Sequence, residues 1–268
     1  MPSTSTEEPN DPPSVRDGSR SPISIEPAGT ALFFDFDGTL AAIADEPAAV
    51  RVEARIIDAL DVLREASGGA LAIVSGRSIE QIDQFLYPLR LPAAGVHGIE
   101  RRDAQGRFSR VEVDRNVLDR LQAEIAAFVE GRPGLLAELK FGSVALHYRK
   151  RADLGPACRE FAAGLVSENP QIRIVTGKKV IELKLADRTK ADAIVDFMSA
   201  PPFAGRRPLF AGDDLTDEDG FAAVARMNGI SIKVGEGDSM ASHRLRDIAA
   251  FHDWLTTLAR RGMVGLPN

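Results

Sequence analysis

The chain has 268 residues, of which 44% are hydrophobic, and a formal net charge of −6. That length allows one large domain or two smaller ones with ordinary hydrophobic cores. The negative charge argues against a nucleic-acid partner, because it would repel a polyphosphate backbone, and no apolar stretch is long enough to span a bilayer. Cys158 is the only cysteine, so no disulfide forms within the chain, and we expect a cytoplasmic protein.

The N-terminal segment, residues 1–27, is rich in Ser, Thr, Pro and charged residues and lacks the apolar stretch of a signal peptide. This composition cannot bury enough surface to offset the entropy lost on ordering. We therefore predict a disordered N-terminal tail over residues 1–27.

A buried strand that ends in aspartates is predicted next. The apolar residues 31–34 lead into Asp35 and Asp37, and Gly38 follows. Because side chains alternate along a strand, Asp35 and Asp37 leave on the same side, and the glycine allows a tight turn. Carboxylates this close repel unless a cation lies between them or one is protonated, and both conditions suit phosphoryl chemistry.

Strand and helix patterns alternate in residues 53–86 and again in residues 190–234, and the segment between them lacks this alternation. Helical spacing occurs over residues 53–66 and 78–86, with an apolar strand at 71–74, and the same alternation returns at 190–198, 208–211, 217–227 and 230–234. This order indicates parallel strands joined by crossover helices. We assign residues 28–101 and 187–268 to this core domain.

The middle, residues 102–186, predicts an antiparallel α+β module inserted into the core. It has strand patterns at 108–113, 172–176 and 180–185, helical patterns at 117–130 and 154–166, and a hairpin formed by residues 135–141 and 143–148 around Gly142.

Further polar motifs follow the predicted core strands. Ser75, Gly76 and Arg77 follow one strand, Lys190 begins a helix, and an acidic cluster at residues 212–219 follows a third apolar run. Each has a plain alternative: a turn, a solvated helix, or a helix-capping acidic patch. Their fixed order favours a functional site.

That order resembles the motifs of the haloacid dehalogenase superfamily of phosphotransferases. A closer resemblance is to the trehalose-6-phosphate phosphatase family, carried by residues 94–100, 137–140, 145–149, 177–182 and 212–219. The resemblance implies a Rossmann-like parallel sheet of the haloacid dehalogenase type, with residues 102–186 as an inserted α+β cap over the pocket.

The resemblance also implies a mechanism. Asp35 attacks phosphorus and forms an aspartyl-phosphate, and Asp37 acts as the general acid and base. Ser75 and Lys190 stabilise the phosphoryl oxygens. The implied cofactor is Mg²⁺, with Asp35, the backbone carbonyl of Asp37 and Asp213 as ligands and Asp214 and Asp217 as outer or alternate ligands.

The implied substrate is trehalose 6-phosphate, which would be hydrolysed to trehalose and phosphate. Glu138, Lys140 and Glu182 occupy positions that resemble the family's glucose contacts, and strand alternation places acidic, basic and hydroxyl side chains on shared faces. The predicted substrate-binding residues are Ser75, Gly76, Arg77, Glu138, Lys140, His147, Arg149, Lys178 and Glu182. Arg77 and His97 are predicted at the pocket edge, although His97 and Gly98 could equally serve a turn near the cap linker.

Alternatives stay open at this stage. The same core chemistry suits another sugar or polyol phosphate, and a catalytically silent regulatory partner of a sugar-phosphate synthase would keep the fold. We expect a monomer whose partner is the small-molecule substrate.

Overall fold

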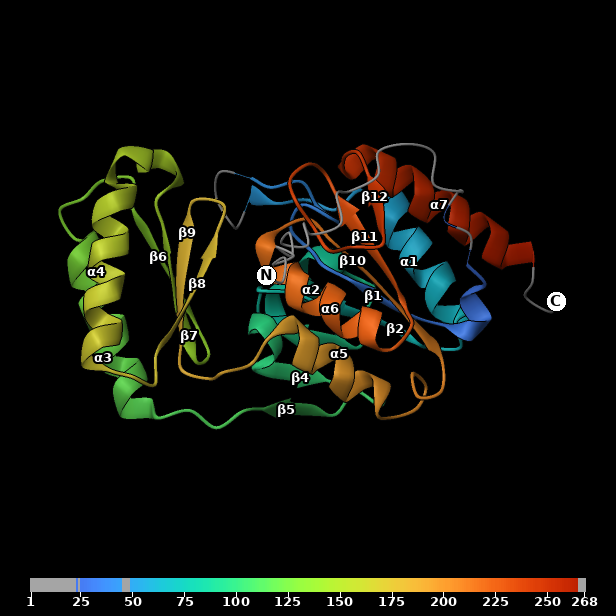
Figure 1. The fold of residues 1–268 in the computed structure, drawn as a ribbon, viewed down its shortest axis with the longest axis horizontal. Helices are drawn as coiled ribbons and strands as arrows, with labels where there is room; N and C mark the ends of the chain where they lie inside the picture. Colours follow the sequence, from blue (N-terminus) through green and yellow to red (C-terminus); the bar gives the residue numbers. More distant parts are fainter. Residues whose placement is uncertain (1–22, 24, 45–48, 265–268) are drawn as a thin grey trace, which may run out of the picture.

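The computed structural model describes residues 23, 25–44 and 49–264, which form a larger core and a smaller part that we call the cap (Figure 1). The core strands are β1 (Thr30–Phe34), β2 (Leu71–Val74), β3 (Ala93–Gly95), β4 (Glu100–Arg102), β5 (Phe108–Arg110), β10 (Arg207–Gly212), β11 (Ile230–Val234) and β12 (His243–Leu245). The core helices are α1 (Ala54–Ala66), α2 (Ile79–Leu86), α5 (Lys190–Met198), α6 (Glu218–Arg226) and α7 (Ile248–Val264).

The core sheet is mostly parallel, as predicted. Its strand order is β12-β11-β10-β1-β2-β3-β4-β5, and every pair from β12 to β3 is parallel, whereas β4 and β5 are antiparallel additions at one edge. The central strand β1 lies between β10 and β2. The carboxyl ends of these neighbouring strands therefore meet at one edge of the sheet, which is where open α/β sheets place their ligands.

Helices cover both faces of this sheet, so β1 is apolar on both sides. Leu32 and Phe34 pack against α1, α2 and α7, whereas Ala31 and Phe33 pack against α5 and α6. The Phe33 ring stacks on Phe203 with a centroid distance of 5.4 Å. This two-sided burial explains the unbroken apolar run before Asp35.

Local hydrogen bonds set where two core helices begin. Ser78 and Gln81 form a capping box at the start of α2, and Thr189 and Asp192 form another at the start of α5. Reciprocal capping of this kind satisfies amides that have no partner inside the helix. As a result, Lys190 occupies the first position of α5, at the carboxyl edge of the sheet.

The cap is an antiparallel sheet with helices on one face. Its strands are β6 (Leu136–Lys140), β7 (Ser143–His147), β8 (Arg173–Gly177) and β9 (Val180–Lys184), in the order β6-β7-β9-β8. The helices α3 (Arg115–Val129) and α4 (Gly155–Glu168) pack on the face that carries Val144, Leu146, Ile181 and Leu183. The predicted hairpin is confirmed by the pairing of β6 with β7.

The cap begins later in the chain than predicted. Strand β5 pairs with β4 at the edge of the core sheet, so residues 102–110 belong to the core sheet rather than the cap. Since all residues of β5 are exposed, their pattern carries no information about which sheet they join.

At the other end, Ile23 and Ile25, placed in the tail by the sequence prediction, pack against the core. Pro27 of the predicted tail is buried as well, at the start of a 3₁₀ turn, whereas residues 1–22 and 24 lie outside the described residues. In the described part of the chain, no helix is both long and apolar enough to cross a membrane.

The packing of Phe33 in the core can be tested by substitution. Phe33→Ala should lower the free energy of unfolding by about 3–5 kcal/mol, because it leaves a cavity in a packed aromatic cluster, and urea denaturation at fixed protein concentration measures this. The control Val195→Ala removes a side chain that is 49% exposed on α5. That control should change stability by less than about 0.5 kcal/mol. A loss below about 1 kcal/mol for Phe33→Ala would contradict the packing described.

Candidate active site

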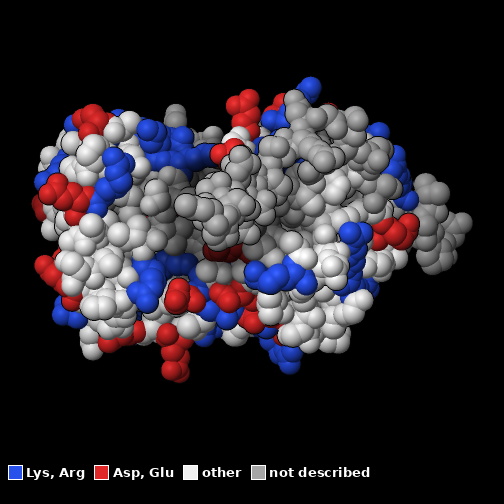
Figure 2. All heavy atoms as spheres, viewed as in Figure 1, with Lys and Arg blue, Asp and Glu red and all other residues white. Residues whose placement is uncertain are grey.

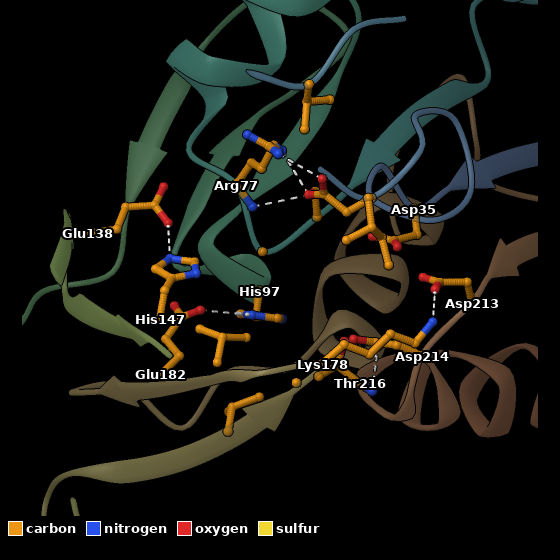
Figure 3. A pocket seen from close by; sticks show the side chains of 18 of the residues that line it. Asp35, Arg77, His97, Glu138, His147, Lys178, Glu182, Asp213, Asp214 and Thr216 are labelled. Atoms are coloured by element: carbon orange, nitrogen blue, oxygen red, sulfur yellow. Dashed lines mark hydrogen bonds and ion pairs between the residues drawn. The ribbon is translucent and has the colours of Figure 1, made fainter. Parts of the chain in front are cut away.

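The candidate site lies where the cap faces the carboxyl ends of β1, β2 and β10 (Figure 3). All of the predicted site residues line one pocket: Asp35, Asp37, Ser75, Gly76, Arg77, Glu138, Lys140, His147, Arg149, Lys178, Glu182, Lys190, Asp213 and Asp214. The fold thus brings together residues from both parts of the core sequence and from the cap. In Figure 2, lysine and arginine side chains border the hollow between cap and core, with acidic side chains among them.

A buried ammonium joins the acidic groups. Lys190 Nζ donates to Asp35 Oδ1 at 2.7 Å and to Asp217 Oδ1 at 2.6 Å. Burial alone would lower the pKa of Lys190, but Asp217 and Asp35 hold it well above the ordinary value. Burial and the Asp217 charge raise the pKa of Asp35, with Lys190 opposing them. Lys190 therefore remains cationic and is a direct neighbour of the predicted nucleophile.

Asp217 organises the loop that follows β10. Its Oδ2 accepts from the backbone amides of Asp213 and Asp214, both at 2.9 Å. From β11, the buried Lys233 Nζ donates to the Asp213 carbonyl at 2.6 Å. The sequence assignment left Asp217 among the outer or alternate ligands and did not identify Lys233, whose only signal was a lysine inside a mostly apolar strand.

The structure provides a cluster of oxygen donors suited to a hard divalent cation. Carboxylate oxygens of Asp35, Asp213 and Asp217 lie within 4.8 Å of one another, and all three residues are buried. Burial raises the pKa of Asp213 to about 6, although Lys178 opposes this. A cation among these groups would offset the repulsion that burial magnifies.

Gly38 makes room for this cluster. Its φ is +80°, and a Cβ there would lie 2.2 Å from the Asp213 carboxylate carbon. No side chain fits at that distance, so a glycine directly after the aspartate pair allows the loops after β1 and β10 to approach each other.

Asp214 caps the turn that follows β10. Its Oδ1 accepts from the Thr216 amide at 2.8 Å and from the Thr216 hydroxyl at 2.7 Å, capping the short turn η5 (Leu215–Asp217). Burial would raise the pKa of Asp214, but Lys190 and the Thr216 hydrogen bonds lower it. The oxygen cluster contains Asp217 and not Asp214, whose role as an outer or alternate ligand stays a prediction.

Asp37 forms a bidentate ion pair with Arg77. Arg77 Nε and Nη2 each lie 2.7 Å from an oxygen of Asp37. The guanidinium also lies over the Phe36 and Phe85 rings, 5.4 and 4.9 Å from their centroids. In this arrangement both Asp37 oxygens accept hydrogen bonds from Arg77, and each oxygen keeps a second lone pair that can carry a proton.

The cap presents a charged wall to the same cleft. The strand register aligns Glu138, Ala145, Glu182 and Val175 in one row across the sheet, next to a row that contains Lys140, Ser143, Lys184 and Arg173. Glu138 Oε2 pairs with His147 Nε2 at 2.9 Å. Rows of carboxylates beside rows of ammonium groups offer acceptors and donors together.

Direct polar contacts connect the cap and the core. Gln81 donates to Glu138 at 2.8 Å, Lys140 Nζ donates to the Gly76 carbonyl at 2.9 Å, and Lys178 Nζ donates to Asp213 Oδ2 at 2.6 Å. The cap is thus closed onto the loops that carry the predicted phosphoryl chemistry.

Arg149 and Ser75 also make hydrogen bonds with neighbouring backbone groups. Strand β7 ends at His147, and Arg149 lies in the 3₁₀ turn η4 (Arg149–Leu154), where its Nη2 donates to the Lys178 carbonyl at 2.8 Å. Ser75 is buried, and its Oγ accepts from the Arg77 amide at 3.1 Å. Both residues still line the pocket.

Comparison with known proteins agrees with this geometry. A family model described as trehalose-phosphatase matches residues 33–249. The chain is 41% identical over 225 residues to a trehalose-6-phosphate phosphatase of Escherichia coli, covering 84% of this chain and 85% of that one. It is 40% identical over 216 residues to a probable trehalose-phosphate phosphatase of Sinorhizobium fredii, covering 80% and 81%. The C-terminal domain of trehalose-6-phosphate phosphatase from C. albicans superposes with a TM-score of 0.77 at 22% identity, covering 86% and 92%, which shows a shared fold.

The contribution of Glu138 to the free energy of unfolding should depend on pH. Burial would raise the pKa of Glu138, but His147, Lys140 and Gln81 lower it from 4.5 to about 2. Because the folded-state value is the lower one, the stabilisation is present above 4.5 and is lost as the pH falls towards 2. Glu138→Gln should therefore reduce the free energy of unfolding at neutral pH, and its difference from the parent should shrink as the pH falls through that window.

Urea denaturation of both proteins across this pH range measures the difference. As a control, Glu160→Gln replaces an exposed glutamate on α4 and should differ from the parent by less than about 0.5 kcal/mol throughout. A difference for Glu138→Gln that stays constant with pH would contradict the ion-pair argument.

Proposed function

The chain belongs to the trehalose-phosphatase family, whose members are phosphoric monoester hydrolases, and we propose that it hydrolyses trehalose 6-phosphate to trehalose and phosphate. The observation that carries the proposal is that one pocket holds an acidic phosphoryl site on the core and a wall of carboxylates, lysines and histidine on the cap. A disaccharide phosphate has one charged end and many hydroxyls, and the two sides of the pocket suit these two ends.

The first half of the proposed reaction is a displacement at phosphorus. A carboxylate oxygen of Asp35 forms a bond to phosphorus while the bond to the sugar oxygen breaks, giving an aspartyl-phosphate and the free sugar. Asp37 gives a proton to the departing oxygen, while Arg77 holds the Asp37 side chain in place. In the second half, water attacks phosphorus, Asp37 accepts its proton, and phosphate leaves with Asp35 restored.

We propose Mg²⁺ as the cofactor, held by Asp35 and Asp213 with Asp217 beside them and the Asp37 backbone carbonyl as a further donor. When bound, it would supply the positive charge that lets a dianionic phosphate approach a carboxylate. Lys190 contributes a second, permanent positive charge next to Asp35. Ser75, at the end of β2, is placed to donate to a phosphoryl oxygen.

The cap residues are proposed to bind the sugar. Glu138 and Glu182 accept hydrogen bonds from hydroxyls, and Lys140 and Lys178 donate to them. Another sugar or polyol phosphate would meet the same phosphoryl site, so the cap decides the substrate. Cytoplasmic location and a monomeric state stay predictions.

The first test is phosphate release from a panel of sugar phosphates in the presence of Mg²⁺. Trehalose 6-phosphate should be preferred, and Asp35→Asn should reduce turnover by at least about 10³-fold, because it removes the nucleophile. As a matched control, Asp253→Asn changes an aspartate whose side chain is 77% exposed and should leave turnover unchanged.

Equal activity over the panel would keep the phosphatase and discard trehalose 6-phosphate as the substrate. No activity with any phosphate ester would instead support a silent regulatory partner.

The close approach at Gly38 gives a second prediction. Gly38→Ala should reduce turnover by at least about 100-fold, because its methyl group would displace the Asp213 carboxylate and misplace a group that must be positioned to within about 1 Å. Gly235→Ala is the matched control, since Gly235 also has a positive φ, +84°, but nothing lies within 4 Å of its added Cβ.

Both variants bear a similar backbone strain, so a loss of turnover seen in Gly38→Ala alone cannot come from that strain. If Gly38→Ala retains more than half of the parent turnover, Asp213 does not need the space that this glycine provides.

A further inference from the structure

The turn that follows β3 is strained and carries a buried histidine. Val96 and His97 both have a positive φ, 48° and 53°, in the turn η3 (Val96–Gly98). A β-branched valine is an outlier in that region, and such strain persists only where surrounding contacts enforce it.

The enforcing contacts come from the loop that carries Ser75. The His97 amide donates to the Ser75 carbonyl at 2.9 Å, and the Val96 amide donates to the Arg77 carbonyl at 2.8 Å. The strained turn is thereby fixed to the loop after β2. Gly76 completes the fit, because a Cβ at this position would lie 2.7 Å from His97 Nε2.

The His97 side chain points from the turn η3 to the cap (Figure 3). His97 Nε2 lies 3.3 Å from Glu182 Oε2, and both side chains are buried. Lys140 Nζ lies 3.3 Å from the same oxygen, and the Ser143 hydroxyl donates to Glu182 Oε1 at 2.7 Å. Glu182 is thus held by two cap residues and by one residue of the core.

The charge balance suits a neutral histidine that donates to a carboxylate. Burial lowers the pKa of His97, with Glu182 opposing this. Burial would raise the pKa of Glu182, but Lys140 and His97 lower it, so Glu182 is ionised. With Glu182 as the acceptor, the Nε2–H tautomer of His97 is the one that satisfies both groups.

We propose that His97 is a positioning residue that sets specificity for the sugar. It orients the Glu182 carboxylate towards the sugar hydroxyls and, through its backbone bond to Ser75, ties the sugar-binding wall to the phosphate-binding loop. A substrate that fills both sites depends on this connection, and a phosphate ester without a sugar does not. The inference rests on the proposed function.

The test compares two substrates in two His97 variants. His97→Asn keeps a residue type that adopts positive φ readily but is too short to reach Glu182. It should lower kcat/KM for trehalose 6-phosphate about 10- to 100-fold, the range expected for one hydrogen bond to a charged group. For p-nitrophenyl phosphate, which has no sugar, kcat/KM should stay within about twofold of the parent, which also shows that the variant is folded.

His97→Gln restores an amide donor near the place of Nε2 and should recover most of the loss with trehalose 6-phosphate. A double-variant cycle adds a second readout. If His97 acts through Glu182, adding His97→Asn to Glu182→Gln should cost less than about threefold beyond Glu182→Gln alone.

Several outcomes would overturn the inference. Retention of activity on trehalose 6-phosphate by His97→Asn would show that His97 does not position Glu182, while the proposed function stands. An equal loss on both substrates, or additive losses in the double variant, would place His97 in general support of the core. A parent chain that hydrolyses p-nitrophenyl phosphate but not trehalose 6-phosphate would overturn the proposed function and this inference with it.

Discussion

The ion triad of Lys190, Asp35 and Asp217 is the interaction on which the rest of the site depends. Carboxylates from the ends of β1 and β10 meet in a buried place, and without a cation their mutual repulsion and desolvation would oppose folding of these loops. Lys190 supplies that cation from the first position of α5, where the Thr189 capping box places it. Lys190 at the start of α5 thus connects Asp35, the predicted nucleophile, with Asp217 in the loop that holds Asp213.

Two lysines of the cap add further polar contacts to this charged cluster. Lys178 reaches Asp213, and Lys140 reaches both Gly76 and Glu182, so each lysine connects a cap strand or turn with a core group. The proposed sugar-binding residues and the predicted phosphoryl site are therefore parts of one electrostatic network. The fold alone would not imply this, because the same α/β scaffold can host unrelated functions, whereas a specific set of charged side chains in one pocket restricts the chemistry.

Much of the core and the hairpin of the cap could be predicted because local signals and burial agree there. The apolar run before Asp35, the helical spacing of Ile56, Leu60 and Leu63, and the hairpin around Gly142 all appear where their patterns indicate. The strands β3, β4 and β12 and the helix α7 were not predicted. These strands have three residues each, too short to show a period, and α7 carries a charged and mixed pattern near the chain end.

By itself the sequence determined the order of the motifs, the alternation that aims Asp35 and Asp37 together, and the presence of an inserted α+β module. These follow from local periodicity and chain order. Only the tertiary structure decided that β5 joins the core sheet, that Asp217 stands in the oxygen cluster, that Asp37 pairs with Arg77, and that His97 meets Glu182. Each of these depends on a contact between groups distant in the chain or on the exact turn of a loop, and local side-chain patterns carry no information about either.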